Sequence, residues 1–284
     1  MERIETHRKF YAELVTGNAG VPRGDGRLVA AFATVPREDF VGAGPWKIFT
    51  AVGYIETPTD DAAFLYQDVV VAIAPERKIN NGQPILHALS LAALGVKEGE
   101  KAVHIGSGTG YYTAILARLV GPSGSVVGYE LERDLAARAT LNLADETHAR
   151  VEARSGAEGE LPKCDAIYVS AGATAPMNAW LNALRVGGRL LFPLTPSEGP
   201  SGTPGAGGML LVTRSAEEKF GARFLCPAAF VGCAGARDDE TAAKLSEAFR
   251  KGNWREVKSL RRGTEPDETC WVAGQGWWLS TKEE

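Results

Sequence analysis

The sequence has no long apolar run, few cysteines and few histidines, and each shortage excludes a class of protein. No stretch approaches the ~18 apolar residues of a membrane-spanning helix, and the charged start MERIETHRKF is unlike a signal peptide. The four cysteines form no CxxC motif, which indicates reduced thiols in a cytoplasmic protein. The four histidines are scattered without zinc-ligand spacing. We therefore expect a cytoplasmic protein with no metal site and no membrane partner.

The chain also lacks the excess of basic residues that is typical of nucleic-acid-binding proteins. Its 284 residues carry a formal net charge of −4 at pH 7, so no nucleic-acid partner is expected. The composition, 44% hydrophobic and 23% charged, is that of an ordinary globular protein. At about 150 residues per domain, this length permits up to two domains.

The N-terminal part is predicted to be mainly helical. Apolar residues recur at helical spacing over residues 2–16, and a second helical pattern over 27–41 is stopped at Pro36. Residues 42–66 mix glycine, proline and aromatic residues, and we expect them to be irregular. Residues 1–75 are accordingly interpreted as a helical and irregular region that packs on the core.

From residue 102 onward, short apolar or β-rich runs alternate with helix-like segments. The runs are AVHIG, SVVGYE, ARVEAR, CDAIYVS and GRLLFPL. Strands that alternate with helices favour a parallel sheet covered on both faces. Two further runs, MLLVTRS and ARFLCPAAFVG, lie close together and predict an antiparallel addition at the edge of the sheet. The expected fold class is α/β, with a mostly parallel twisted sheet and an antiparallel edge.

The C-terminal part departs from this alternation. A Gly/Pro/Ser-rich loop is expected at 197–208 and a polar helix at 239–251. We assign 76–232 to the core domain and 233–284 to a small C-terminal extension. Its aromatic residues are predicted to lie in the core or in a homodimer interface, with a lid over the substrate as the alternative; they are Trp271, Trp277 and Trp278.

A glycine-rich turn joins the strand AVHIG to the next helix. The turn is Gly106–Gly110, with the sequence GSGTG, and its glycines permit positive φ and close approach of a ligand to the helix N-terminus. The following strand ends on Glu130, whose carboxylate can accept hydrogen bonds from both hydroxyls of a ribose. Together these features predict a nucleoside-binding site.

The spacing within this turn distinguishes between cofactors. Dinucleotide-binding folds use G-x-G-x-x-G beneath a pyrophosphate, whereas this turn reads G-x-G-x-G and no basic residue accompanies it. The pattern favours S-adenosyl-L-methionine, which needs no phosphate cradle. NAD is the specific alternative, and a glycine turn in some other α/β fold is the general one.

Three sequence blocks occur in a specific order. They are VPREDFV at 35–41, then GSGTGYYTAILARLVGPSGSVVGYE, then CDAIYVSAGATAPMNAWLNALRVGGRLLFPL. Together they resemble the protein-L-isoaspartate O-methyltransferase family over roughly residues 24–195. The resemblance implies a Rossmann-like class I methyltransferase fold, with S-adenosyl-L-methionine as cofactor and S-adenosyl-L-homocysteine as product. It also implies methyl transfer to a carboxylate oxygen.

The same resemblance implies a set of cofactor-binding residues. The turn would contact the methionine part, Glu130 the ribose, and Leu131 the adenine. Ser155 and Gly156 would lie near the adenine edge, while Ser170 and Ala171 would line the transfer site. The full set is Gly106, Ser107, Gly108, Gly110, Tyr112, Glu130, Leu131, Ser155, Gly156, Ser170, Ala171 and His87. His87 corresponds to a position where some family members place a histidine near the cofactor, and the alternative for it is a partly buried helix residue.

Two positions depart from the family pattern near the cofactor. His104 stands where the family commonly has a strand-one acid, and we interpret it as a core residue without a catalytic role. The family's Gly-Asp-Gly reads Arg154-Ser155-Gly156 here. An amide or hydroxyl contact to the adenine amino group would then replace the carboxylate.

The third departure lies in the active-site turn. Asn80-Asn81-Gly82-Gln83-Pro84 falls on the family's Thr-Ile-Ser-x-Pro, so Gly82 replaces the serine and its hydroxyl. The substrate-turn candidates are therefore Asn81, Gly82 and Gln83. Their amides, with that of Asn80, could hold a substrate carboxylate; alternatively, they only satisfy the N-terminus of the following helix.

Three functions follow from these observations. The first is an S-adenosylmethionine-dependent methyltransferase that O-methylates a carboxylate of an isoaspartyl peptide, another peptide or a small-molecule acid. A carboxylate is ionised at pH 7 and needs no general base. The second is a catalytically altered S-adenosylmethionine- or nucleoside-binding module, and the third is a NAD-dependent oxidoreductase.

Overall fold

The chain divides into two structural units in the computed structural model. The structure describes residues 2–21, 26–196 and 207–283, so most of the predicted loop at 197–208 lies outside the described residues. One unit contains residues 1–100 and 107–154, and the other contains 101–106 and 155–284. No helix of the described residues is long and apolar enough to cross a membrane. The four cysteines are free.

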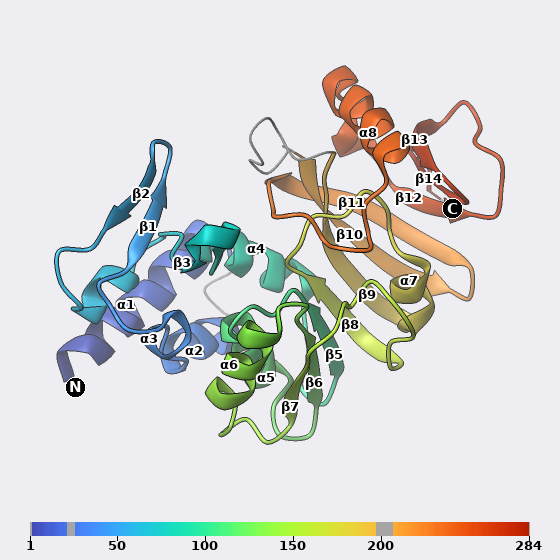
Figure 1. The fold of residues 1–284 in the computed structure, drawn as a ribbon. Helices are drawn as coiled ribbons and strands as arrows, with labels where there is room; N and C mark the ends of the chain where they lie inside the picture. Colours follow the sequence, from blue (N-terminus) through green and yellow to red (C-terminus); the bar gives the residue numbers. More distant parts are fainter. Residues whose placement is uncertain (1, 22–25, 197–206, 284) are drawn as a thin grey trace. The chain divides into compact units, whose positions relative to one another are not determined.

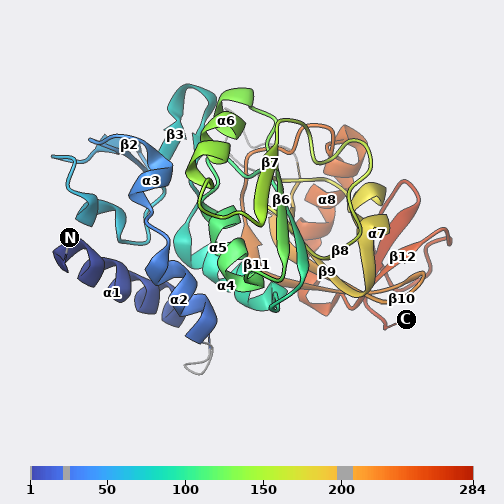
Figure 2. The ribbon, with the colours of Figure 1, turned by 90° about the horizontal axis from the view of Figure 1, so that it is seen from below.

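Helices form much of the first unit. Helix α1 (Glu2–Asn18) packs against α2 (Gly26–Thr34) and α4 (Pro84–Leu94), and α2 also contacts α5 (Tyr111–Val120). Figures 1 and 2 show α1 and α2 side by side. Both predicted N-terminal helices are confirmed. The short helix α3 (Glu38–Val41) follows α2.

Residues 42–66 contain regular structure, so the prediction of an irregular segment is wrong. Strands β1 (Lys47–Thr50) and β2 (Gly53–Glu56) form an antiparallel hairpin. Thr50 Oγ1 donates to the carbonyl of Gly53 at 2.7 Å, and Gly53 has a φ of 113°. Strands of four residues carry too little periodicity to be recognised among the surrounding glycines and prolines.

A second small sheet leads into the NNGQP turn. Strands β3 (Ala72–Ala74) and β4 (Ile79–Asn80) pair antiparallel. The 3-10 helix η2 (Pro75–Arg77) joins them, and η1 (Ala62–Leu65) precedes them. The backbone N–H of Asn81 donates to the carbonyl of Val71 at 2.7 Å. The start of the turn is thus held by the same backbone pairing that forms the sheet.

The first unit also contains the predicted alternation of strands and helices. Strand β6 (Ser125–Tyr129) follows α5, and α6 (Arg133–Asn142) connects it to β7 (Ala149–Glu152). The two strands pair in parallel, with Val126 opposite Ala149. The acid Glu130 therefore lies at the carboxyl end of β6, as the sequence predicts.

A parallel core lies at one side of the sheet in the second unit. Its strands are β5 (Lys101–Ile105), β8 (Cys164–Val169) and β9 (Leu184–Leu194), and β8 pairs in parallel with both neighbours. Helix α7 (Asn178–Ala183) connects β8 to β9. The inner residues of β5 and β8 are buried as near-continuous apolar runs, which is typical of parallel strands.

Antiparallel strands extend this sheet from β9. Strand β10 (Gly207–Ala216) pairs with β9 and with β11 (Lys219–Ala228), which confirms the predicted antiparallel addition. The C-terminal extension adds β12 (Ser259–Arg262), β14 (Trp277–Ser280) and β13 (Cys270–Gly274). Over the described residues of this unit the order is β13-β14-β12-β11-β10-β9-β8-β5.

The helix of the C-terminal extension is confirmed over its predicted residues. Helix α8 (Asp239–Lys251) is capped by Asp238, whose carboxylate accepts from the N–H of Thr241. It contacts β13, as Figure 1 shows in orange and red, and the 3-10 helix η4 (Trp254–Glu256) follows it. Trp277 and Trp278 are buried, so the core interpretation is confirmed for both of these residues.

A buried arginine organises the segment before the NNGQP turn. Arg37 of the VPREDFV block is fully buried, and its guanidinium donates to the carbonyls of Leu65, Gln67 and Val69 at 2.7, 3.2 and 2.6 Å. A buried cation must be hydrogen-bonded to offset its lost hydration. Arg37 therefore holds residues 65–69, and with them Asp68, in one conformation.

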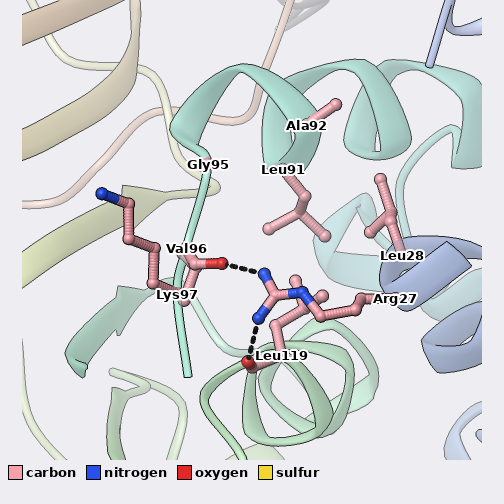
Figure 3. Close-up of a pocket in the computed structure, with 8 residues that line it drawn as sticks. All are labelled: Arg27, Leu28, Leu91, Ala92, Gly95, Val96, Lys97 and Leu119. Atoms are coloured by element: carbon pink, nitrogen blue, oxygen red, sulfur yellow. Dashed lines mark hydrogen bonds between the residues drawn. The ribbon is translucent and has the colours of Figure 1, made fainter. Parts of the chain in front are cut away.

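An exposed arginine elsewhere in the same unit also donates hydrogen bonds to backbone carbonyls. Arg27 donates to the carbonyls of Leu119 and Val96 at 3.4 and 2.5 Å, across a pocket of ≈ 180 Å³ between α2, α4 and α5 (Figure 3). None of the predicted site residues lines this pocket. Arg27 offers a matched control for the buried Arg37, because it also donates to backbone carbonyls.

We expect Arg37→Met to lower the free energy of unfolding by about 3 kcal/mol, because three buried carbonyls lose a charged donor. Arg27→Met should cost about 1 kcal/mol or less, since water can replace its contacts. Urea unfolding followed by circular dichroism measures both. Equal losses in the two variants would contradict the organising role of Arg37.

Candidate functional site

The glycine-rich turn needs glycine at three positions. Gly106, Gly108 and Gly110 have φ values of 77°, 55° and 96°, a region that other residues adopt at a cost. Gly110 is the N-cap of α5 and has no side chain to cap it. Between them, Thr109 Oγ1 donates to the carbonyl of Phe40 at 2.5 Å. The turn is thus tied to the VPREDFV block.

The turn lies directly against strand β6. The N–H and hydroxyl of Ser107 both donate to the carbonyl of Tyr129, at 3.1 and 3.3 Å. A Cβ atom at Gly128 would lie 2.6 Å from Ser107 Oγ. Gly128 is therefore required for this close approach. The sequence analysis missed it, although a glycine inside a strand pattern is a known sign of such contact.

Glu130 links the turn to the end of β6. Its carboxylate is buried and accepts from the N–H of Gly108 at 2.7 Å and of Glu132 at 3.0 Å. Burial raises its pKa above the ordinary value. A carboxylate has about four acceptor positions, so capacity for ribose hydroxyls remains. Leu131 beside it is half exposed, as an apolar side chain facing a nucleobase would be.

The NNGQP turn is held by hydrogen bonds to two neighbouring segments. Tyr54 of the β1–β2 hairpin donates its hydroxyl to Asn80 Oδ1 at 2.7 Å. Gln83 Nε2 donates to Asp68 Oδ2 at 2.8 Å, and the N–H of Ile85 donates to Asp68 Oδ1 at 2.8 Å. Asp68 therefore satisfies one N–H at the N-terminus of α4, and the N-cap residue Gln83 makes no capping hydrogen bond with its side chain. The alternative in which the turn amides only cap this helix is wrong.

Two buried polar side chains lie at or just after this turn, His87 in α4 and Asn81 in the turn itself. His87 is buried, and its ring stacks on Tyr112 with centroids 3.6 Å apart and planes at 4°. Asn81 is also buried, and its Oδ1 has no hydrogen-bond partner within the described residues. A buried amide oxygen without a donor is costly, and it marks a place where a ligand can bind.

His104 lies in the second unit as a buried core residue, which confirms the interpretation from sequence. Its Nε2 is 3.0 Å from Ser170 Oγ, and its ring stacks on Tyr168 with centroids 5.3 Å apart. Burial lowers its pKa to about 3. The imidazole is therefore neutral at pH 7 and orients the hydroxyl of Ser170.

The predicted adenine-edge residues are bonded within the second unit. Ser155 Oγ donates to the carbonyl of Ala234 at 3.2 Å and accepts from the N–H of Ala157 at 3.1 Å. The carbonyl of Gly156 accepts from Trp180 Nε1 at 2.8 Å. The hydroxyl proton of Ser155 is thus already donated, and its remaining capacity is as an acceptor.

The predicted site residues fall into two sets, one in each unit. The second unit brings Gly106 close to the strand end that carries Ser170 and Ala171, since a Cβ at Gly106 would lie 3.4 Å from Ser170 O. Within the first unit, a hydrogen bond joins Gly108 to Glu130, and ring stacking joins His87 to Tyr112. The first-unit members are Asn81, Gly82, Gln83, His87, Ser107, Gly108, Gly110, Tyr112, Glu130 and Leu131.

Comparison with known sequences identifies the family. The family model for protein-L-isoaspartate(D-aspartate) O-methyltransferase matches residues 18–202. The chain belongs to this family. It is 32% identical over 210 residues to the protein-L-isoaspartate O-methyltransferase of Methylorubrum populi, covering 73% of this chain and 86% of that protein. It is 34% identical over 209 residues to protein-L-isoaspartate O-methyltransferase 2 of Marinobacter nauticus, covering 70% and 82%.

Solved structures of this family share the fold. A protein-L-isoaspartate O-methyltransferase matches 85% of this chain and 69% of its own, with a TM-score of 0.64 and 21% identity. A second one, from Plasmodium falciparum in complex with S-adenosyl-L-homocysteine, matches 80% and 98% with a TM-score of 0.60 and 20% identity. The predicted Rossmann-like class I methyltransferase fold is confirmed.

The enzyme class and cofactor follow from the family. The chain is an S-adenosylmethionine-dependent methyltransferase, as predicted. The comparisons give no support to the altered binding module or to the NAD-dependent oxidoreductase. The glycine spacing therefore distinguished correctly between the two cofactors.

The buried His104 predicts a pH dependence of stability. Its pKa is about 3 in the folded chain and about 6.5 when unfolded. Between these values only the unfolded state binds the proton, so stability falls as the pH is lowered through this range. Between pH 6.5 and 5.0 the wild type should lose about 2 kcal/mol more than His104→Gln, because each pKa unit is worth about 1.4 kcal/mol.

Urea unfolding at the two pH values measures this difference. His7→Gln serves as the control, since His7 is exposed on α1, and it should keep the wild-type pH dependence. An unchanged pH dependence in His104→Gln would show that His104 is not held neutral.

Proposed function

We propose that the enzyme methylates the free carboxylate of isoaspartyl residues in polypeptides. The observation that carries this proposal is the family match, which extends over residues 18–202 and so includes both the glycine-rich turn and the NNGQP turn. The relatives from Methylorubrum populi and Marinobacter nauticus are both named protein-L-isoaspartate O-methyltransferases. A different peptide or a small-molecule acid is the alternative acceptor.

The surface around the NNGQP turn favours a polypeptide acceptor over a small acid. The β1–β2 hairpin is bonded to the turn through Tyr54 and Asn80. This hairpin exposes the apolar side chains of Phe49, Val52 and Ile55. Exposed apolar residues gathered on one element commonly mark contacts with another protein. A polypeptide can cover these side chains while its carboxylate reaches the turn.

We assign cofactor binding to the residues around the glycine-rich turn. S-adenosyl-L-methionine supplies a methyl group on a sulfonium when it is bound. Glu130 accepts hydrogen bonds from the ribose, Leu131 covers the adenine, and the glycines allow close approach of the backbone. The remaining proposed contacts are Ser107, Tyr112, Ser155, Gly156, Ser170, Ala171 and His87.

The protein contributes position rather than a base. The acceptor carboxylate is ionised at pH 7, so one of its oxygens forms the new bond to carbon without losing a proton. Holding the reacting atoms in line can lower the barrier by on the order of 7–11 kcal/mol. We assign this positioning to the NNGQP turn, where Arg37 and Asp68 fix the backbone and Asn81 meets the acceptor.

Glu130→Gln should weaken the binding of S-adenosyl-L-homocysteine roughly tenfold, because a hydrogen bond to a charged acceptor contributes about 1.5–3 kcal/mol. Titration calorimetry measures the dissociation constant. Glu132→Gln is the matched control two residues away and should bind normally. Unchanged affinity in Glu130→Gln would remove Glu130 from the cofactor site.

Incubation with labelled S-adenosyl-L-methionine tests the proposed activity. An isoaspartyl peptide should acquire a base-labile methyl ester, whereas the same peptide with normal aspartate should acquire almost none. The aspartyl peptide is the control, because it differs only in which carboxyl group forms the backbone. Absence of ester on the isoaspartyl peptide, together with normal S-adenosyl-L-homocysteine binding, would reject the acceptor and keep the enzyme class.

A further inference from the structure

We propose that Arg77 is a positioning residue that fixes the NNGQP turn relative to the cofactor-binding end of β6. This inference rests on the proposed function, which assigns acceptor binding to that turn. Residues 72–80 contain β3, η2 and β4 and lead directly into the turn. We call this segment the strap. The strap, the turn and the end of β6 all belong to the first unit.

Short strands give the strap little stability of its own. Strand β3 has three residues and β4 has two, and a two-stranded hairpin is at best marginally stable in water. Lys78, between η2 and β4, has a φ of 58°, which a residue with a Cβ adopts at a cost. Contacts with the rest of the unit must therefore hold the strap in place.

Arg77 supplies an ionic contact at the tip of the strap. Its guanidinium donates two parallel hydrogen bonds to Asp134, from Nη1 to Oδ1 at 2.9 Å and from Nη2 to Oδ2 at 2.6 Å. Nη1 also donates to Glu132 Oε2 at 2.5 Å, and Nε donates to the neighbouring Glu76 at 3.3 Å. A two-pronged contact fixes the orientation of a guanidinium as well as its position. The hydrogen bonds from Arg77 lower the pKa of Asp134 to about 2, so this carboxylate is charged at pH 7.

The carboxylates that hold Arg77 lie beside the predicted ribose contact. Glu132 and Asp134 directly follow the end of β6, where Glu130 accepts from the N–H of Gly108 and from the N–H of Glu132. The acid assigned to the ribose is therefore bonded to the backbone of the residue whose side chain accepts from Arg77. Through these contacts the strap is tied to the cofactor-binding segment.

An apolar contact joins the strap to the glycine-rich turn. A Cβ atom at Gly108 would lie 3.6 Å from Ile73 Cδ1, so the Ile73 side chain lies close to this turn. Ile73 and Arg77 thus fix the strap at two points, one apolar and one ionic. Where the strap ends, the N–H of Asn81 donates to the carbonyl of Val71 at 2.7 Å.

The NNGQP turn is consequently held at both of its ends. Arg37 fixes Asp68, which binds the Gln83 amide after the turn, and Arg77 fixes the strap before it. Asn81 lies between these anchors, and its buried Oδ1 has no hydrogen-bond partner within the described residues. A misplacement of about 1 Å can cost roughly a hundredfold in rate. Arg77 limits such displacement, because its backbone leads into the turn and its partners lie at the cofactor site.

Kinetics on the isoaspartyl peptide test this role. Arg77→Gln and Asp134→Asn should each lower kcat/KM roughly threefold to tenfold, because exposed ion pairs contribute modestly and Arg77 joins two carboxylates. The dissociation constant of S-adenosyl-L-homocysteine should stay unchanged. The double variant should be no worse than Arg77→Gln, since the two side chains form one contact. Arg133→Gln is the matched control, because it removes an exposed cation beside Asp134, and it should keep the wild-type kcat/KM.

Two outcomes of these kinetics would overturn the proposal. One is a wild-type kcat/KM in Arg77→Gln. The other is a loss of S-adenosyl-L-homocysteine affinity as large as the loss of kcat/KM, since Arg77 would then serve the cofactor site alone.

Ionic strength separates a charged contact from a merely structural one. Arg77→Lys should recover part of the lost kcat/KM, because an ammonium group can still pair with one carboxylate. Raising NaCl from about 0.05 M to about 0.5 M should bring the wild type and Arg77→Gln closer together, since salt screens exposed pairs. A ratio that stays constant over this range, or an Arg77→Lys variant as impaired as Arg77→Gln, would overturn the proposal.

Amide hydrogen exchange tests the anchoring of the strap without any substrate. Exchange over residues 71–83 should be faster in Arg77→Gln than in the wild type, because the strap loses its ionic contact, while exchange over α2 should not change. Equal exchange over 71–83 would overturn the inference and leave the proposed function intact. If the wild type instead forms no ester on the isoaspartyl peptide, the proposed function fails, and the positioning role of Arg77 fails with it.

Discussion

The buried guanidinium of Arg37 is the contact on which the geometry of the NNGQP turn depends. It satisfies three carbonyls between residues 65 and 69 and so fixes Asp68. Asp68 in turn accepts from the Gln83 amide and from the N–H of Ile85 in the first turn of α4. A buried cation tolerates little movement of its partners, because each lost hydrogen bond leaves an unpaired group in a low-dielectric interior. Arg37, which lies outside the NNGQP turn in sequence, therefore fixes the conformation of the turn through Asp68.

Missing side chains are as informative in this protein as those that are present. Gly128 admits the hydroxyl of Ser107 against β6, and Gly82 admits the ring of His87. In both cases a Cβ atom would lie well inside van der Waals contact with a polar atom. Each glycine thus allows a neighbour to bring a hydrogen-bonding group to a place that its own side chain would block. Close packing makes this exchange specific, since little other space is available.

Membership of the protein-L-isoaspartate O-methyltransferase family and the departures from its pattern are compatible for a physical reason. Methyl transfer to a carboxylate needs no covalent catalyst and no base, so its positioning groups can be exchanged as long as the acceptor remains in line. His104 is buried and neutral at pH 7, and its Nε2 lies 3.0 Å from Ser170 Oγ, so this position holds a hydrogen-bonding group rather than a charge.

Local sequence patterns were sufficient to predict the fold class and the cofactor of this protein. The alternation of apolar runs with helices, the GSGTG turn and the position of Glu130 predicted the α/β fold and the cofactor, because periodicity and glycine spacing are properties of short segments. The short β1–β2 hairpin, the capping of α4 by Asp68 and the burial of Arg37 were decided only by the tertiary structure. Each of these joins residues distant in sequence or depends on a neighbour's volume. The sequence analysis considered Gly82 and His87 separately. The packing shows that the His87 ring occupies the place where a side chain of residue 82 would begin.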